Sequence, residues 1–134
     1  MEIGPLVTPL VVSAQTGDTL AVVARRLWAQ GIGSLPIFEG TRLVGMISER
    51  DLVTAVALGA TAEAAAAAHM SRGAATAHPG DDCAEVARRM LELGVRHLPV
   101  VDGGGQVVGM VSARDLLELV ARPEPGLPAL AAGA

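Results

Sequence analysis

Apolar residues recur at helical spacing in two separated stretches of the chain, and each stretch is bounded by residues typical of helix ends. The first begins near Thr19 and the second near Asp82, both favourable N-cap types, and Glu85 predicts a capping box with Asp82. Gly31 and Gly94 follow the two stretches, where a left-handed residue ends a helix. The apolar face of the first helix comprises Leu20, Val23, Ala24, Leu27 and Trp28.

Each predicted helix is followed by two short apolar runs that are separated by a turn. The runs cover residues 32–38 and 43–47, and again 95–101 and 107–111. Their β-branched content and the glycine-bearing turns between them predict two hairpins. Pro36 and Pro99 remove a backbone donor from each first hairpin strand, so we expect that edge to face a cleft or a bulge.

Further elements are predicted at both ends of these units. Ser48 and Ser112 each open a second helix, and residues 10–14 and 74–77 each predict a short strand ahead of the first helix. An alanine-rich stretch, residues 59–68, extends or follows the helix that opens at Ser48.

The same order of elements occurs twice because the sequence itself repeats. Residues 17–57 and 80–121 align with about half of the positions identical and a single one-residue insertion. The predicted fold class is therefore α/β (α+β), with two βαββα repeats packed as a pseudo-twofold pair that has two related clefts. We place the first repeat at 7–58, an alanine-rich linker at 59–69, the second repeat at 70–121 and a flexible tail at 122–134.

Composition narrows the function without identifying it. The formal net charge of −4 argues against a nucleic-acid partner, and no apolar run approaches the roughly 20 residues of a membrane span. The start of the chain lacks the order of a signal peptide, so we expect a cytoplasmic protein. The single cysteine, Cys83, excludes an internal disulfide and is expected in the core. No arrangement of residues indicates a metal site or catalysis, so we expect no enzyme.

The landmarks that both copies share resemble those of the CBS domain, named for cystathionine β-synthase. They are Leu35-Pro36 and Leu98-Pro99, Gly45 and Gly109, Ser48 and Ser112, and Asp51 and Asp115. The resemblance covers residues 7–121 and implies a CBS pair, or Bateman module, whose two units pack sheet to sheet. It also implies a homodimer and a regulatory role, in which an adenosine-containing ligand is bound and the signal is passed to an effector protein in trans.

The candidate ligand-binding residues lie where each second strand leads into a helix, at 45–51 and 109–115. The first amides of a helix are unpaired and favour a phosphate, and in ligand-binding members of the family the Ser and Asp contact phosphate or ribose. The resemblance thus assigns Ser48, Asp51, Ser112 and Asp115 to ligand binding. Ser-x-x-Asp is also a capping pattern, and the two roles are compatible.

The two copies differ at the positions ahead of the Leu-Pro landmark. The second copy has Arg96 and His97, which with Arg114 would surround an anion near Ser112; the first has small residues and only Arg50. Alternatively, Arg96 is a solvated strand residue and His97 a neutral hydrogen-bonded imidazole. By pseudo-symmetry the base would lie against the other copy's first strand, near Ala14 for one site and Thr76 for the other.

Two functional hypotheses follow. In the first, the chain is a stand-alone regulatory module that binds AMP, ADP, ATP, NAD or S-adenosylmethionine in a cleft between the repeats and requires no cofactor. In the second, both clefts are empty and the protein is a structural module for dimerisation or docking through its helices. A weaker third hypothesis is an accessory subunit of an enzyme.

Overall fold

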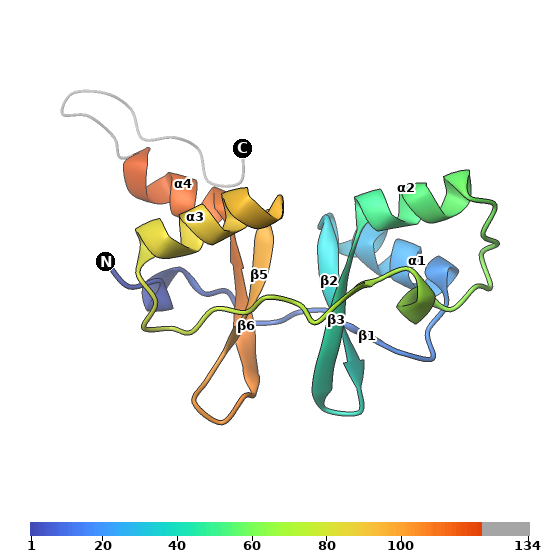
Figure 1. Cartoon of the computed structure of the whole chain (residues 1–134), viewed down its shortest axis with the longest axis horizontal. Coiled ribbons are helices and arrows are strands. Elements are labelled where there is room, and N and C mark those ends of the chain that lie inside the picture. The colour runs from blue at the N-terminus through green and yellow to red at the C-terminus, as the bar shows by residue number, and fades with distance from the viewer. Residues whose placement is uncertain (122–134) are drawn as a thin grey trace.

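The computed structural model describes residues 1–121 and consists of two similar halves that lie side by side (Figure 1). The first half contains β1 (Ala14–Gln15), α1 (Leu20–Gln30), β2 (Ser34–Glu39), β3 (Arg42–Ser48) and α2 (Glu49–Ala57). The second contains α3 (Cys83–Leu93), β5 (His97–Val101), β6 (Val107–Ser112) and α4 (Ala113–Val120). Short 3-10 turns, η1 (Gly4–Leu6) and η2 (Ala66–Ala68), and a strand, β4 (Ser71–Arg72), complete the chain. The mixed α/β fold with two repeats is thereby confirmed.

The two hairpins form where the sequence predicts them and face each other between the pairs of helices (Figure 1). Antiparallel β2 and β3 pair Ser34 with Ser48, and β5 and β6 pair His97 with Ser112 at the equivalent end. Both ladders shift register one residue beyond the prolines, between Ile37 and Phe38 and between Val100 and Val101. The expectation that the prolines accompany an irregularity is met by these shifts.

The helix ends follow their local signals, with one exception. Thr19 accepts the Val22 amide, and Gly31 and Gly94 adopt φ values of 62° and 66°. The predicted capping box of Asp82 with Glu85 is wrong. Asp82 caps the amide of Ala84, whereas the Glu85 carboxylate pairs with Arg88 at 2.7 Å, one turn along the helix.

The predicted strands ahead of the first helices are largely wrong, because the residues upstream of them pair with the opposite half. Only Ala14–Gln15 lies beside β2, and Ala77 forms a single parallel bridge with Val100. Upstream of them, Thr8 bridges Met110 of β6, and β4 pairs with β3. We call residues 9–13 and 73–76 the crossing segments, since each runs from one half to the other (Figure 1).

The exchange extends into the two hydrophobic cores. Ile3, at the start of the chain, is fully buried in the core of the second half with Val86 and Val111. Ala66, which precedes the second half, is fully buried in the core of the first with Ile37. The alanine-rich stretch follows α2 rather than extending it, and it contributes to the core of the first half. Each core is thus completed by residues upstream of the other repeat.

Gly45 and Gly109 are required by this exchange. Both glycines lie inside their strands, since β3 continues to Ser48 and β6 to Ser112. A Cβ on Gly45 would lie 2.6 Å from the Ser71 carbonyl oxygen, and one on Gly109 would overlap the carbonyl of Thr8. The close approach is therefore made by another segment of this chain.

The apolar periodicity of the two first helices predicts that Trp28 and Met90 are core residues or dimer contacts. Met90 is buried, at 4% exposure, whereas Trp28 is 89% exposed. Cys83 is buried in the core of the second half, as predicted.

Candidate ligand-binding site

The serine and aspartate at the start of α2 and of α4 form reciprocal capping boxes. The Ser48 Oγ accepts the Asp51 amide at 3.2 Å, and Asp51 Oδ2 accepts the Ser48 amide at 2.8 Å. Ser112 and Asp115 repeat the arrangement at 3.0 and 2.8 Å. The capping interpretation of Ser-x-x-Asp is confirmed. These bonds hold each partly buried carboxylate beside the first amides of its helix.

In the second half, the structure brings Arg96 and His97 to the same helix start. His97 lies opposite Ser112 in the hairpin, and the Arg96 carbonyl accepts the Ala113 amide at 2.8 Å. Arg114, on the first turn of α4, is exposed. The residues that the sequence proposes for an anion therefore surround one helix N-terminus.

His97 is held in its neutral form by its surroundings. Burial lowers the pKa of the imidazole below its usual 6.5, the neighbouring Arg96 guanidinium lowers it further, and the Asp115 carboxylate acts in the opposite direction. At pH 7 the ring is neutral, so it offers one donor and one acceptor. A phosphate brought beside it would favour the protonated form.

The equivalent place in the first half has different chemistry. The Gly33 carbonyl accepts the Glu49 amide at 2.9 Å, and a Cβ on Gly33 would lie 3.3 Å from Glu49 Oε1. Ser34 faces Ser48 in the hairpin, and within the described residues its Oγ is buried without a hydrogen-bond partner. Glu49 is a further candidate residue that the sequence reasoning did not single out, although its alignment with Ala113 is visible in the repeat.

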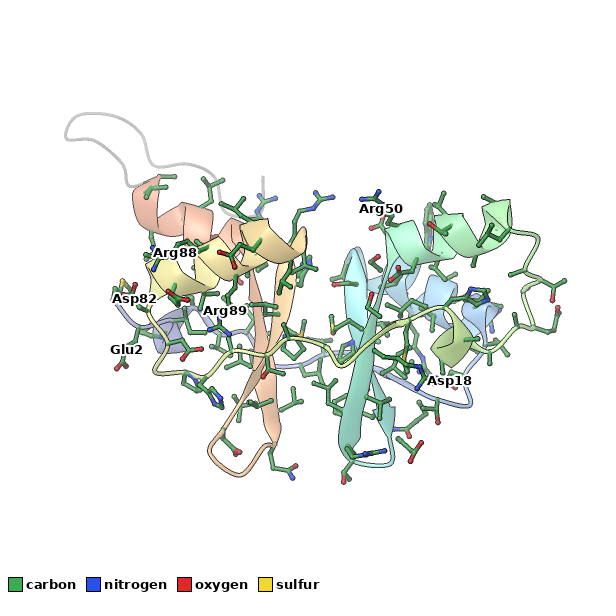
Figure 2. The ribbon with its side chains drawn as sticks, in the orientation of Figure 1. Glu2, Asp18, Arg50, Asp82, Arg88 and Arg89 are labelled. Atoms are coloured by element: carbon green, nitrogen blue, oxygen red, sulfur yellow. The ribbon has the colours of Figure 1, made fainter. Side chains whose placement is uncertain are left out.

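The three remaining residues that the sequence predicts for ligand binding lie at three different places in the structure. Arg50 is exposed on the first turn of α2, on the side toward the other half (Figure 2). Ala14 is 1% exposed and packs in the core of the first half, so its side chain does not face a cleft. Thr76 lines an open recess of about 480 Å³ between the turn ends of the hairpins, with Arg42 and Gln106 among its neighbours. The recess adjoins the Arg42 end of β3, whereas Ser48 is at the other end of that strand.

A comparison with models of protein families identifies the family of this chain. The CBS domain model matches residues 3–58 and 65–122, which together account for most of the chain. The chain belongs to the CBS domain family. The resemblance drawn from the Leu-Pro, Gly, Ser and Asp landmarks is thereby confirmed.

Sequence relatives within this family include longer proteins. The chain is 30% identical over 122 residues to an uncharacterized protein of Methanopyrus kandleri, covering 89% of this chain and 62% of that protein. It is 33% identical over 125 residues to the magnesium transporter MgtE of Thermus thermophilus, covering 89% of this chain and 27% of the transporter. The chain thus spans under two thirds of the first relative and about a quarter of the second. Enzyme names occur among other relatives, and they too describe longer proteins.

Solved CBS pairs share the fold over nearly their whole length. The CBS domain pair of protein MJ0100, in complex with 5′-methylthioadenosine and S-adenosylmethionine, is 27% identical with a TM-score of 0.81, covering 90% of this chain and 95% of that one. A CBS domain protein of Pyrobaculum aerophilum complexed with AMP is also 27% identical with a TM-score of 0.81, covering 91% and 100%. Among the helices of residues 1–121, none has both the length and the hydrophobicity needed to cross a membrane.

Proposed function

We propose that this CBS pair is a regulatory module that binds an adenosine-containing ligand between its halves and signals to an effector protein in trans. The observation that carries the proposal is the cluster of Arg96, His97 and Ser112 at the start of α4. A guanidinium and a histidine beside the positive end of a helix dipole together suit a phosphate. The AMP complex of the Pyrobaculum relative supports the same ligand class.

The second-half site would hold the phosphate and ribose of an adenine nucleotide. Asp115 accepts the ribose hydroxyls, Arg96 and Arg114 neutralise the phosphate, and His97 hydrogen-bonds it. The base reaches toward crossing segment 9–13, which leaves β6 beside Met110. A ligand that touches both halves favours one relative orientation of them by its differential affinity, and that orientation is the signal.

The first-half site suits a ligand without a phosphate. Glu49 adds a carboxylate at the start of α2, where the second half has Ala113, and Gly33 and Ser34 replace the arginine and histidine. Repulsion between carboxylate and phosphate disfavours a nucleotide there. Neutral or cationic adenosine compounds fit better, and the methylthioadenosine and S-adenosylmethionine complex of the MJ0100 pair supports that class.

A homodimer is the assembly that the surface favours. Trp28, Val53, Val56 and Leu58 are exposed on or just after α1 and α2, and Leu91, Leu117 and Val120 are exposed on α3 and α4. Trp28, Val53 and Val56 occupy the same positions of the repeat as Leu91, Leu117 and Val120. A twofold partner therefore meets a similar apolar surface from both halves. This face also supports the alternative function, a docking module with both clefts empty.

Isothermal titration of the full chain with AMP, ADP, ATP, NAD and S-adenosylmethionine tests the proposal. We expect saturable binding of a phosphate-bearing ligand that Asp115→Ala abolishes and that Asp51→Ala leaves intact. Asp115→Asn retains a capping oxygen and separates lost ribose binding from a lost cap. Absence of heat with every ligand, on folded and ligand-free protein, would support the docking module instead.

A further inference from the structure

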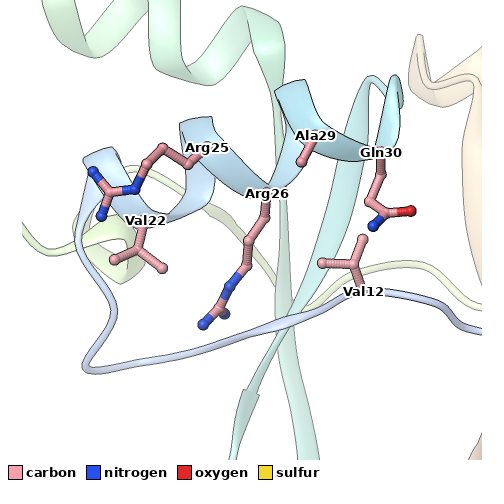
Figure 3. Close-up of a pocket in the computed structure, with 6 residues that line it drawn as sticks. All are labelled: Val12, Val22, Arg25, Arg26, Ala29 and Gln30. Atoms are coloured by element: carbon pink, nitrogen blue, oxygen red, sulfur yellow. The ribbon is translucent and has the colours of Figure 1, made fainter.

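Two arginines at matching positions of the repeat hold the ends of the crossing segments. Arg26 Nη1 on α1 donates to the Ser13 carbonyl at 2.8 Å and to Asp18 Oδ2 at 3.0 Å. On α3, Arg89 donates to the Thr76 carbonyl at 2.7 Å and to Asp81 Oδ2 at 2.6 Å. Figure 3 shows Arg26 reaching from α1 toward the segment that carries Val12, and Figure 2 shows Arg89 reaching toward the other crossing segment.

Each arginine is part of a larger bonded unit. Asp18 Oδ2 also accepts the Gln15 amide at 2.7 Å, and Asp81 Oδ2 also accepts the His78 amide at 2.9 Å. The guanidinium therefore joins the helix, the turn before it and the last residue of the crossing segment. The paired side chains are 25–40% exposed, so these charge-assisted bonds are less screened than those of a surface pair.

The neighbouring arginines have no such role in the described structure. Arg25 is exposed, and Arg88 pairs with Glu85 along the same helix face, with both side chains more than half exposed. The sequence favours a solvated face or a salt bridge to Glu85 or Glu92 for all four arginines. The Arg88–Glu85 pair confirms that interpretation for Arg88, and the carbonyl contacts of Arg26 and Arg89 contradict it for these two residues.

The far end of each crossing segment is attached to the opposite half. Segment 9–13 follows Thr8, which is bonded to Met110 on the strand that leads to Ser112. Segment 73–76 follows Arg72, which pairs with Gly45 on the strand that leads to Ser48. One end of each segment is therefore held by a sheet of one half and the other end by an arginine of the other half.

We infer that Arg26 and Arg89 are positioning residues for ligand binding, and that each acts on the site of the half to which it does not belong. Arg26 fixes the segment that leaves β6 beside Met110, and Arg89 fixes the segment that leaves β3 beside Gly45. The inference rests on the proposed function, because it assigns these segments as the base-facing walls of the two clefts. It adds a crosswise link between the halves. A ligand at the Asp115 site contacts the segment that Arg26 of α1 holds, and a ligand at the Asp51 site contacts the segment that Arg89 of α3 holds.

Titration of the full chain with AMP and, separately, with 5′-methylthioadenosine tests the inference. We expect Arg26→Met to weaken AMP binding about tenfold and to leave methylthioadenosine binding within twofold. Arg89→Met should do the reverse. Arg25→Met and Arg88→Met are the matched controls and should change neither affinity. Arg26→Lys retains one charged donor, so its AMP affinity should lie between those of the wild type and the Met variant, and it replaces the Met variant if that fails to fold.

The outcomes separate the two proposals. If the wild type binds and Arg26→Met weakens both ligands equally, or neither, the crosswise assignment is wrong while the proposed function stands. If Arg26→Met weakens methylthioadenosine instead, each arginine serves its own half and the inference is overturned. If the wild type binds no ligand, the proposed function fails and the inference fails with it. Thermal unfolding without ligand shows whether each variant is folded.

Discussion

The starts of α2 and α4 have the same scaffold and different charges. Both have a serine N-cap, an aspartate three residues later, a glycine that admits a backbone from the opposite half, and an arginine on the preceding helix that holds a crossing segment. Around the second, Arg96 and Arg114 are exposed cations, and neutral His97 and Ala113 add no carboxylate. Around the first, Glu49 adds a carboxylate, and Gly33 and Ser34 add no charge. The shared residues make bonds within the chain, and the residues that differ lie beside the two helix starts.

This difference teaches that a repeat can diverge in ligand chemistry without a change of fold. The capping bonds and the glycine contacts are satisfied by this chain itself, so any substitution there costs stability. Arg96 and Glu49 are not needed for the fold in the same way, because their backbone groups make the structural bonds and their side chains are free to vary. The following predictions test how far that separation holds.

The largest expected effect is on stability and comes from a shared position. Gly109→Ala should lower the free energy of unfolding by about 3 kcal/mol, because its Cβ would overlap the rigid Thr8 carbonyl. Gly45→Ala should cost about 2 kcal/mol, since one of its close atoms, the Met70 sulfur, lies on a flexible side chain. Urea denaturation measures both. Gly103→Ala is the control, because no atom of the described residues lies within 4 Å of the new methyl group. Equal stability of all three variants would contradict the role of the exchange.

Next is the loss of a charge from the cationic site. Arg96→Ala should weaken binding of AMP about thirtyfold, because a hydrogen bond to a charged group is worth about 2 kcal/mol. Its bond to the Ala113 amide is made by the backbone carbonyl, so the urea midpoint should stay within the error of the wild type. Isothermal titration gives the affinity. Unchanged binding would remove Arg96 from the site and weaken the contrast between the halves.

Removal of the Glu49 carboxylate in the first half tests the same charge difference between the two sites from the other side. Glu49→Ala installs the residue that the second half carries and should strengthen AMP binding at the first site about threefold, by removing a repelling carboxylate. The same change removes an acidic residue from the first turn of α2 and should cost about 0.5 kcal/mol of stability. Titration of Glu49→Ala in the Asp115→Ala background isolates the first site. A further loss of affinity there would show that Glu49 contacts the ligand favourably.

The smallest effect is a pH dependence confined to the second half. A phosphate beside His97 raises the pKa of the imidazole, so affinity for AMP should increase about twofold as the pH falls from about 7.5 to 6. His97→Gln should have a flatter profile, which corrects for titration of the phosphate itself. Without ligand, the free energy of unfolding changes with pH in the opposite direction to the AMP affinity. The folded protein lowers the pKa of His97, so stability is lost as the pH falls below 6.5, and His97→Gln should lose less.

Local signals account for the correct part of the sequence analysis. The helix ends are specified by bonds within a few residues, made by Ser48 and Ser112 with their aspartates and by Gly31 and Gly94. They can therefore be predicted without knowledge of the tertiary structure. The internal repeat further predicted that two similar units pack against each other. The adjacency of Arg96 and His97 to Ser112 also followed, because a hairpin with a known turn brings its two ends together.

The errors arise where distant segments meet. The sequence predicts strands at residues 10–14 and 74–77, but their neighbours pair across the pseudo-twofold axis and leave little ladder of their own. For Trp28 the sequence leaves two places open, the core or a dimer contact, and within the described chain only Leu20, Val23 and Leu27 of α1 reach the core. Periodicity specifies which residues share a face of a helix; it does not specify how much of that face the rest of the molecule covers.

The sequence by itself therefore determined the repeat, the hairpins, most helix caps and the family, since each depends on residues close together in the chain or on the likeness of the two copies. Only the tertiary structure decided which half each leading segment completes, why Gly45 and Gly109 lack side chains, and which arginines hold the crossing segments. Those contacts join residues about 13 to 100 positions apart. Their partners are selected by the packing of whole elements, which no short pattern encodes.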